Sequence, residues 1–566
     1  MTRSRIILTL LLLLSSGHLL LAQRQDKPNI LFIAVDDLKP VLGCYGDKLV
    51  KTPNIDRLAK MGTVFMNNHC QQSVCGPTRA SLMTGLRPDV TRVLDLKTKM
   101  RDMLPDVVTL PQYLISQGYT TSGVGKIYHP SCTDKQFDAP SWSIPFIVAE
   151  DKDYANGLGE PAFKHYQQTA LKELALSDAK AKKDKKDVSK SSGDKKDKSK
   201  KSNEGGEEEV AAKPEKVKKG KDDDSEGSSK RGPATECLDL PDNAYEDGVT
   251  ALKARQQIIA LSKNAAPFFM AVGFHKPHLP FVAPKKYWDM YKEQDMPLAP
   301  FQEHAANSPF IAYTRAGELR NYTDIPEFVT KPEELLQIGL KPEKQKQLVH
   351  GYYAAVSYMD AQVGILLNTL DSLGTLNNTI IVLWGDHGWH LGDHDLWCKH
   401  TNFEQATRSP LIIAAPGIKS GKTNSPSEHL DVFPTLCNLS GLKIPTQLQG
   451  KSLKPVMQNN KASVKDFAVS QYPRRVKKDE MKTLGYTDSK LMGYSIRTEK
   501  YRYTLWINNY NSREVFSPEK IYATELYDYV KDPLEKTNVA NDSKYGDIAK
   551  DLYAKLTGFL KEQEAK

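Results

Sequence analysis

The chain has 566 residues, which is enough for two domains with sizeable hydrophobic cores. Its hydrophobic fraction of 39% and its charged fraction of 26% are those of an ordinary globular protein. The net charge of +9 would suit a nucleic-acid partner, but much of it lies in one lysine-rich tract with no recognition motif beside it. We therefore exclude nucleic acid as a partner.

The N-terminus has the pattern of a secretory signal. Arg3 and Arg5 precede an interrupted apolar stretch over residues 6–21, and Ala22 is the predicted last residue removed. The apolar stretch is broken and short for a membrane span, so a membrane anchor is the weaker alternative. We predict a signal peptide over residues 1–22 and a secreted or periplasmic protein with no stable membrane insertion after cleavage.

Several apolar runs predict buried strands that alternate with helices. One long helix is expected between the second and third runs, because residues 343–373 carry apolar side chains at helical spacing. The runs that predict strands are residues 28–35, 267–274, 379–384 and 410–415. This alternation predicts an α/β layered sheet.

Polar residues follow three of these predicted strands. They are Asp36-Asp37, the segment 275–278 (His-Lys-Pro-His) and Asp386-His387. In α/β sheets, functional sites lie beyond the carboxyl ends of the strands. We therefore expect these residues to meet at one edge of the sheet.

Two other regions differ in composition from this pattern. Residues 175–235 contain Lys, Asp, Glu, Ser and Gly with almost no aromatic residues, which predicts a disordered surface insertion. A solvated spacer is favoured for it over a segment that binds a polyanionic polysaccharide. After residue 441, β-forming residues and a final helix predict a smaller antiparallel α+β part. We expect a larger domain over residues 23–440 and a C-terminal subdomain over residues 441–566.

The most informative motif is the segment 75–79, Cys-Gly-Pro-Thr-Arg, with Thr84-Gly85 at a fixed offset. The proline and threonine suit the first turn of a helix, so Cys75 lies at a helix N-terminus that favours an anion. Arg79 adds a fixed positive charge one turn further on. Seven cysteines in an exported chain leave one over, which indicates a special thiol, while the pairing of the other six stays open.

This motif resembles the signature of the type I sulfatases, whose cysteine is converted to formylglycine after translation. The companion segments stand in the order of that family. The resemblance implies a sulfatase/alkaline-phosphatase-like fold with helices on both faces of a sheet, and a catalytic domain over residues 23–440. It also implies a sulfatase-maturing or formylglycine-generating enzyme as a partner that modifies Cys75.

The resemblance implies a metal site and a set of catalytic side chains. Carboxylate oxygens with few neutral ligands suit one Ca²⁺ or Mg²⁺ ion better than Zn²⁺, and we expect Ca²⁺. Its implied ligands are Asp36, Asp37, Cys75, Asp386 and His387. The implied catalytic residues are Cys75, Arg79, Lys126, His129, His278 and Lys399.

These residues fit the hydrolysis of a sulfate ester. Such a reaction needs a nucleophile, cations that neutralise the sulfuryl oxygens and a proton for the leaving alcohol. The resemblance makes His278 the candidate proton donor and His129 the candidate base toward the nucleophile, with Lys399 as a sulfate ligand. The alternatives are a phosphoester hydrolase of the same superfold and a glycan-binding protein in which Cys75 stays a thiol.

Within the family, the chain resembles the iduronate 2-sulfatases. The matching segments are residues 42–47, 87–92, 275–281, 385–389, 470–474 and 492–498. The resemblance implies a sulfated carbohydrate substrate with a 2-O-sulfated uronic acid, with another carbohydrate sulfate as the alternative. It places Lys490 where a substrate-binding lysine contacts the uronate carboxylate, beside the substrate contacts of His278 and Lys399.

Overall fold

The computed structural model describes residues 27–149, 233–314, 316–325, 339–475, 490–508 and 516–564. The predicted signal peptide and most of the predicted insertion over residues 175–235 lie outside these ranges. Among the helices in these ranges, none is long and apolar enough to cross a membrane.

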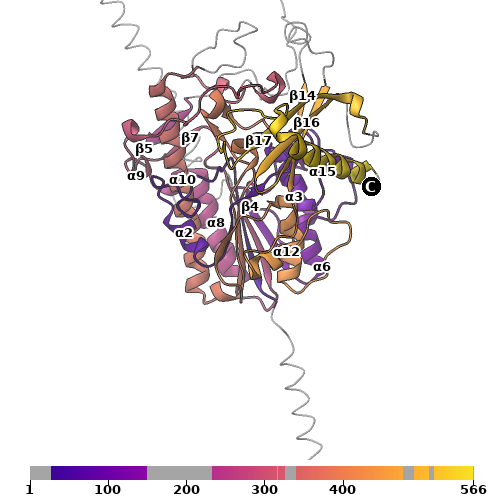
Figure 1. Ribbon diagram of the computed structural model, residues 1–566. Coiled ribbons are helices and arrows are strands. Elements are labelled where there is room, and N and C mark those ends of the chain that lie inside the picture. The colour runs from indigo at the N-terminus through magenta and orange to yellow at the C-terminus, as the bar shows by residue number, and fades with distance from the viewer. Residues whose placement is uncertain are drawn as a thin grey trace, which may run out of the picture.

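The larger part of the protein is built on a seven-stranded sheet (Figure 1). Its strands are β1 (Asn29–Val35), β2 (Thr63–Phe65), β4 (Thr120–Gly125), β6 (Phe268–Phe274), β8 (Thr379–Gly385), β11 (Leu411–Ala414) and β12 (Gly421–Thr423). They lie in the order β12-β2-β11-β8-β1-β6-β4. The central strands β8, β1, β6 and β4 run parallel, with Val35 in register with both Phe274 and Gly385.

All four strands that were expected from apolar runs are present, but the direction of one strand and the presence of another were not expected. Strand β11 runs antiparallel to β8, although its continuous apolar sequence is typical of a parallel strand. Strand β4 has the sequence Thr-Thr-Ser-Gly-Val-Gly, which has too few apolar residues to be recognised as a buried strand. Its glycines instead allow close packing, since a Cβ on Gly125 would lie 2.1 Å from the carbonyl oxygen of Gly273 in β6.

Helices cover both faces of the sheet, as expected. Side chains of β1 alternate between the faces, with Ile33 and Val35 in one hydrophobic cluster and Ile30 and Phe32 in the other. The first face is covered by α2 (Pro53–Ala59), α8 (Glu246–Leu261) and α10 (Pro342–Ser372). The second face is covered by α3 (Cys75–Thr84), α6 (Leu110–Ser116) and α12 (Val432–Leu439).

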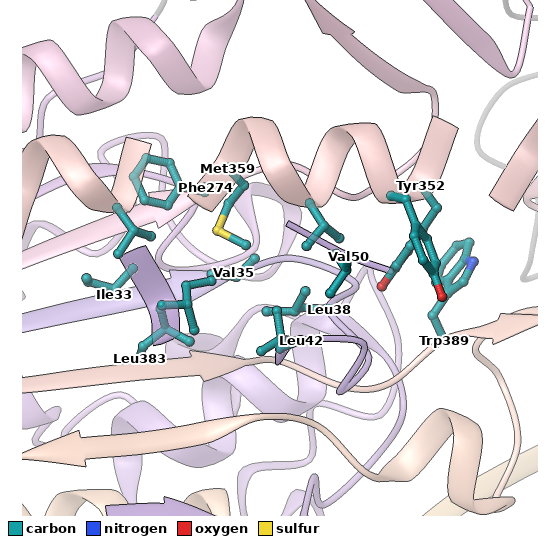
Figure 2. Close-up of a cluster of buried hydrophobic side chains, with 14 of the residues drawn as sticks. Ile33, Val35, Leu38, Leu42, Val50, Phe274, Tyr352, Met359, Leu383 and Trp389 are labelled. Carbon is teal, nitrogen blue, oxygen red and sulfur yellow. The ribbon is translucent and has the colours of Figure 1, made fainter. Parts of the chain in front are cut away.

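Helix α10 is the expected long helix, and it forms much of the first cluster (Figure 2). Its Met359 lies near Phe274 of β6 and Val35 of β1, and its Tyr352 lies beside Trp389 in the same cluster. The Tyr352 hydroxyl also donates a hydrogen bond to the carbonyl oxygen of Asp37 at 2.7 Å. The helix therefore supports the chain at the point where β1 ends.

The C-terminal part forms a separate antiparallel sheet, in agreement with the expected α+β pattern. Its strands are β14 (Ala468–Arg475), β15 (Lys490–Arg497), β16 (Tyr501–Asn508) and β17 (Ile521–Asp528), and α15 (Gly546–Glu564) packs on one face. On the other face, Leu491, Trp506 and Tyr527 pack against Leu396 and Phe403 of the larger part. The two parts therefore share a buried apolar interface.

The remaining elements are short. The strands are β3 (Asn68–His69), β5 (Thr235–Leu238), β7 (Phe281–Pro284), β9 (His390–Leu391), β10 (Trp397–Cys398) and β13 (Ser427–Glu428). The helices are α4 (Pro88–Thr91), α5 (Met100–Met103), α9 (Lys285–Trp288), α11 (Glu404–Thr407) and α13 (Lys454–Gln458). Helix α13 packs in the core of the large sheet through Val456 and Met457, and the second sheet begins at Ala468.

Candidate active site

Three aspartates meet at the carboxyl ends of two paired strands. Asp36 and Asp37 follow β1, and Asp386 follows β8, so the parallel register brings them together. The backbone N–H of Asp37 donates to Oδ1 of Asp386 at 3.0 Å. All three side chains are fully buried, which creates a strong requirement for positive charge nearby.

His387 is oriented like a metal ligand. Its Nδ1 lies 2.9 Å from the carbonyl oxygen of Gly388, so Nδ1 donates to this acceptor and the opposite nitrogen, Nε2, faces the cluster. Nε2 lies 3.3 Å from Cys75 Sγ and 3.3 Å from Oδ1 of Asp37. The imidazole therefore directs Nε2 into the aspartate cluster.

Three triplets among the described residues could hold one cation: two consist of the expected ligands, and the third joins His278 to Asp36 and Asp37. The ligand atoms of Asp37, Cys75 and His387 lie within 4.8 Å of one another, and so do those of Asp36, Cys75 and Asp386. The donor set of three buried carboxylates and one imidazole fits a hard divalent cation. The structure thus brings together all five expected metal ligands.

Cys75 is the first residue of α3 and is buried beside this cluster. Its Sγ lies 3.7 Å from Nζ of Lys399. Burial raises the pKa of the thiol well above its usual range, and the charge of Asp36 adds to the effect. A neutral thiol is a poor nucleophile. All seven cysteines of the chain are free thiols in the structure, so none of the six that could have paired forms a disulfide.

The residue after Cys75 must be small. A Cβ on Gly76 would lie 2.5 Å from Sγ of Cys132, which is itself buried beneath the helix start. The glycine of the motif therefore serves close packing under the reactive position.

Arg79 lies in the first turns of α3 and is fully buried. Its Nε donates to Asp386 at 2.9 Å and one Nη donates to Asp36 at 3.0 Å. The other Nη donates to the backbone carbonyl oxygens of Lys126 and Ile127. The guanidinium is therefore engaged by protein groups on three sides, which favours a role in fixing two metal carboxylates over direct contact with a substrate.

Two lysines border the same cluster from different elements. Lys126 follows β4 and pairs with Asp36, and Lys399 follows β10 and pairs with Asp37 at 2.9 Å. Burial lowers the pKa of each ammonium, but the neighbouring aspartates outweigh it, so both pKa values are raised. Both lysines are therefore charged and lie next to residue 75, as expected.

The two candidate catalytic histidines differ in their surroundings. Burial, together with the charge of Lys126, lowers the pKa of His129 to about 3, so its ring is neutral near pH 7. Its Nδ1 lies 2.8 Å from the hydroxyl of Ser131. Burial also lowers the pKa of His278, but the carboxylates of Asp37 and Glu318 outweigh this effect, and the pKa is raised.

His278 is held at both nitrogens. Nδ1 lies 2.6 Å from the carbonyl oxygen of Leu279, and Nε2 lies 2.9 Å from Oε1 of Glu318. Both partners are acceptors, so this geometry requires a proton on each nitrogen. The loop that carries His278 is anchored by Asp247, which accepts from the backbone N–H groups of His275 and Lys276 at 2.8 and 2.9 Å.

Glu318 is the residue of this site that sequence reasoning missed. It lies in an irregular segment before a single 3₁₀ turn over Leu319–Asn321, where its neighbours form no recognisable motif. Its carboxylate contacts both His278 and Lys399. The sequence contains no periodic or motif signal that could have identified it.

Lys490 is set apart from the other expected residues. It is the exposed first residue of β15 and lies in register with Arg475 of β14. The next residue, Leu491, packs in the interface cluster with Phe403, four residues after Lys399. A contact between Lys490 and a substrate stays a prediction.

The fold and this cluster define a class of enzyme. The sulfatase family matches residues 28–442, and the C-terminal region of N-sulphoglucosamine sulphohydrolase matches residues 392–562. The chain therefore belongs to the sulfatase family, whose members hydrolyse sulfate esters. The expected sulfatase/alkaline-phosphatase-like fold is confirmed.

Individual relatives narrow the comparison. The chain is 32% identical to iduronate 2-sulfatase of Homo sapiens over 92% of this chain and 93% of that protein. A solved structure described as a 2-O GAG sulfatase has a TM-score of 0.58 at 20% identity, covering 95% of this chain and 93% of that one. A phosphonate monoester hydrolase of Agrobacterium radiobacter has a TM-score of 0.64 at 21% identity, covering 95% and 96%. These two structures show a shared fold.

Proposed function

We propose that this chain is an exported sulfatase that removes the 2-O-sulfate of a uronic acid in a polysaccharide, with a formylglycine made from Cys75. The observation that carries the proposal is the buried position of Cys75 at a helix N-terminus, with Nζ of Lys399 at 3.7 Å and Nε2 of His387 at 3.3 Å. The similarity to iduronate 2-sulfatase supports the uronate part.

The proposed metal is Ca²⁺, held by Asp36, Asp37, Asp386, His387 and residue 75. When bound, such an ion neutralises the oxygens of a substrate sulfate as a Lewis acid. The formylglycine hydrate would supply one hydroxyl for attack on sulfur and a second that permits release of the sulfate. A maturing enzyme that oxidises the cysteine is therefore a required partner.

The remaining chemistry falls to side chains of this chain. Lys126 and Lys399 bind the oxygens of the sulfuryl group, and the first contacts Asp36 while the second contacts Asp37. His278 carries a proton on Nε2 for the oxygen of the leaving alcohol. His129 is neutral and takes a proton from the nucleophile. Arg79 keeps the metal carboxylates in place.

Room for an acidic saccharide lies beside this centre. A cavity of about 320 Å³ is lined by Lys99, Ser131 and Lys135, among other residues. The Ser131 hydroxyl lies 2.8 Å from Nδ1 of His129, which links the cavity to one of the proposed catalytic residues. The lining also includes the carboxylate of Asp134, so Lys99 and Lys135 are the groups of this cavity that fit a neighbouring anionic sugar of a polysaccharide.

The proposal is tested by mass spectrometry and by turnover. The peptide with residue 75 from the exported protein should carry an aldehyde in place of the thiol. The protein should release sulfate from a 2-O-sulfated uronide faster than from a sulfated amino sugar or from a phosphate monoester of the same alcohol. An unmodified Cys75 in a fully active protein would overturn the nucleophile, and a preference for the amino sugar would overturn the substrate.

Cys75→Ser provides the matched variant. A serine hydroxyl can attack sulfur once but has no second hydroxyl to expel the sulfate, so we expect complete loss of turnover with unchanged unfolding. Intact-mass analysis should find sulfate attached to the variant. Continued turnover by Cys75→Ser would contradict the mechanism.

A further inference from the structure

Glu318 joins the two charged groups that the proposed mechanism directs at the substrate. Its Oε1 lies 2.9 Å from Nε2 of His278, and its Oε2 lies 3.2 Å from Nζ of Lys399. The side chain is 15% exposed, so water screens these contacts only partly. The glutamate therefore connects a loop after β6 with the segment after β10.

Asp37 also faces both groups, but its position differs. It lies 2.9 Å from Lys399 and 3.8 Å from His278, and it belongs to the residues that could hold the cation. A carboxylate that coordinates a divalent ion attracts other nearby cations less strongly. Glu318 belongs to none of the three metal-type triplets, although His278 belongs to one of them with Asp36 and Asp37, so the charge of Glu318 is available to His278 and Lys399.

We propose that Glu318 is a positioning residue for the sulfatase reaction, which keeps the Nε2–H of His278 directed into the site until the substrate arrives. This inference rests on the proposed role of His278 as proton donor. In the free enzyme Glu318 accepts a hydrogen bond from Nε2–H of His278. In the complex, the ester oxygen that joins sulfur to the sugar replaces Glu318 as the acceptor. As the hydroxyl oxygen of residue 75 bonds to sulfur and the bond between sulfur and the ester oxygen breaks, the Nε2 proton moves to that oxygen and the alcohol leaves. The ring keeps its Nδ1 proton on Leu279 and regains the other from water.

The geometry predicts a split between kcat and KM. Without the carboxylate, the ring of His278 keeps its bond to Leu279 but loses its partner at Nε2. The proton donor is then misplaced, which lowers kcat. Lys399 stays paired with Asp37, and removal of a negative charge near the sulfate site favours sulfate binding. A defect limited to folding would not produce this split.

The experiment compares Glu318→Ala, Glu318→Gln and Glu318→Asp, using whichever sulfate ester the wild-type holoenzyme hydrolyses. We expect Glu318→Ala to lower kcat by about 10-fold to 100-fold, the range of a displaced general acid, with KM unchanged or lower. Glu318→Gln should retain an acceptor oxygen and lose less, and Glu318→Asp should retain most of the rate. Metal content should match the wild type, and each variant should remain folded at the temperature of the assay.

Two controls make the result specific. Glu246 forms a similar pair with Nε2 of His275 at 3.2 Å, three residues before His278, so Glu246→Ala should leave kcat within about twofold if only the Glu318 pair matters. In a double-mutant cycle, Glu318→Ala should add little to the loss caused by His278→Ala.

The outcomes separate this inference from the proposed function. A kcat within about twofold of wild type for Glu318→Ala, or losses that multiply in the double variant, would overturn the role of Glu318 while the enzyme remains a sulfatase. Absence of turnover by the wild type on a 2-O-sulfated uronide would overturn the substrate instead, and the Glu318 series would then be measured on the ester that is hydrolysed.

Discussion

Substitution of Arg79 tests how positive and negative charges balance in the metal site. It forms ion pairs of 3.0 Å with Asp36 and 2.9 Å with Asp386, and all three side chains are fully buried. Arg79→Met keeps much of the apolar volume but leaves two buried carboxylates without this partner. The perturbation therefore removes charge from the site with little change in packing.

The structure predicts how much unfolding free energy Arg79→Met loses, with and without Ca²⁺. Removal of one partner from a buried ion pair costs about 3–5 kcal/mol of unfolding free energy. Asp36 keeps Lys126, so we expect the lower half of that range in the presence of chelator. With Ca²⁺ the loss should shrink, because the ion supplies positive charge to the same carboxylates and binds only the folded state.

The assay is denaturant unfolding in Ca²⁺ and in chelator, followed by tryptophan fluorescence. Trp384 is a suitable probe, since it is buried and its ring lies 5.7 Å from the Arg79 guanidinium. Arg87→Met is the matched control, because Arg87 pairs with Glu428 at 2.8 Å away from the metal residues. Its loss should be the same in both conditions. If Arg79→Met is as stable as wild type in chelator, or if Ca²⁺ restores nothing, the assigned charge balance is wrong.

Three further predictions concern the metal, the substrate and the pH dependence of stability. Asp386→Ala should abolish stoichiometric Ca²⁺ binding, measured by calorimetry, and with it most turnover; an equally active metal-free variant would contradict the ligand assignment. Lys490→Ala should raise KM for a 2-O-sulfated uronide by roughly tenfold and leave KM for the matching neutral sugar sulfate unchanged, while equal effects on both would exclude a carboxylate contact. Burial raises the pKa of Glu525 to about 7 despite hydrogen bonds from Trp506 and Tyr527. A carboxyl whose folded pKa lies above its unfolded value contributes stability at low pH that is lost as pH rises through the folded pKa. Glu525→Gln should therefore match wild type at about pH 4, below the unfolded pKa, and be more stable by up to about 3 kcal/mol at pH 8, and no gain there would refute the assignment.

The sequence predicted the parts of the fold that leave a periodic signal. Strands β1, β6 and β8 and helix α10 were predicted because buried runs and helical spacing both follow from which faces touch the core. Strand β4 was missed because its glycines serve close backbone contact with β6 rather than apolar burial. The direction of β11 depends on its pairing with β8 and β2, which no local pattern specifies.

The same distinction holds within the site. The metal-type residues could be predicted because each stands in a motif at a strand end or, for Cys75, at a helix N-terminus, and the structure brings Asp37, Cys75 and His387 together. The engagement of Arg79 by carboxylates depends on the distance between two strand ends, which is a property of the folded sheet. Glu318 comes from an irregular segment, so only tertiary contacts reveal it.

The C-terminal sheet supports the backbone segment that carries Lys399. Its neighbours Cys398 and His400 both have positive φ values, 69° and 23°, in a conformation that non-glycine residues adopt at a cost. Such a backbone needs external support, and strands of the second sheet provide it. Arg474 donates to the carbonyl oxygen of His400 at 2.8 Å, and Arg502 donates to that of Asn402 at 2.6 Å.

A side chain near Lys399 also contacts the second sheet. The amide of Asn402 donates to the carbonyl oxygen of Gly493 in β15 at 3.1 Å. A Cβ on Gly493 would lie 2.6 Å from that amide, so the glycine allows the close approach. The lysine that faces residue 75 is thus held by a sheet that contributes none of the metal-type residues. Substitutions at Arg474 or Gly493 should therefore reduce turnover through the placement of Lys399 while leaving the metal site intact.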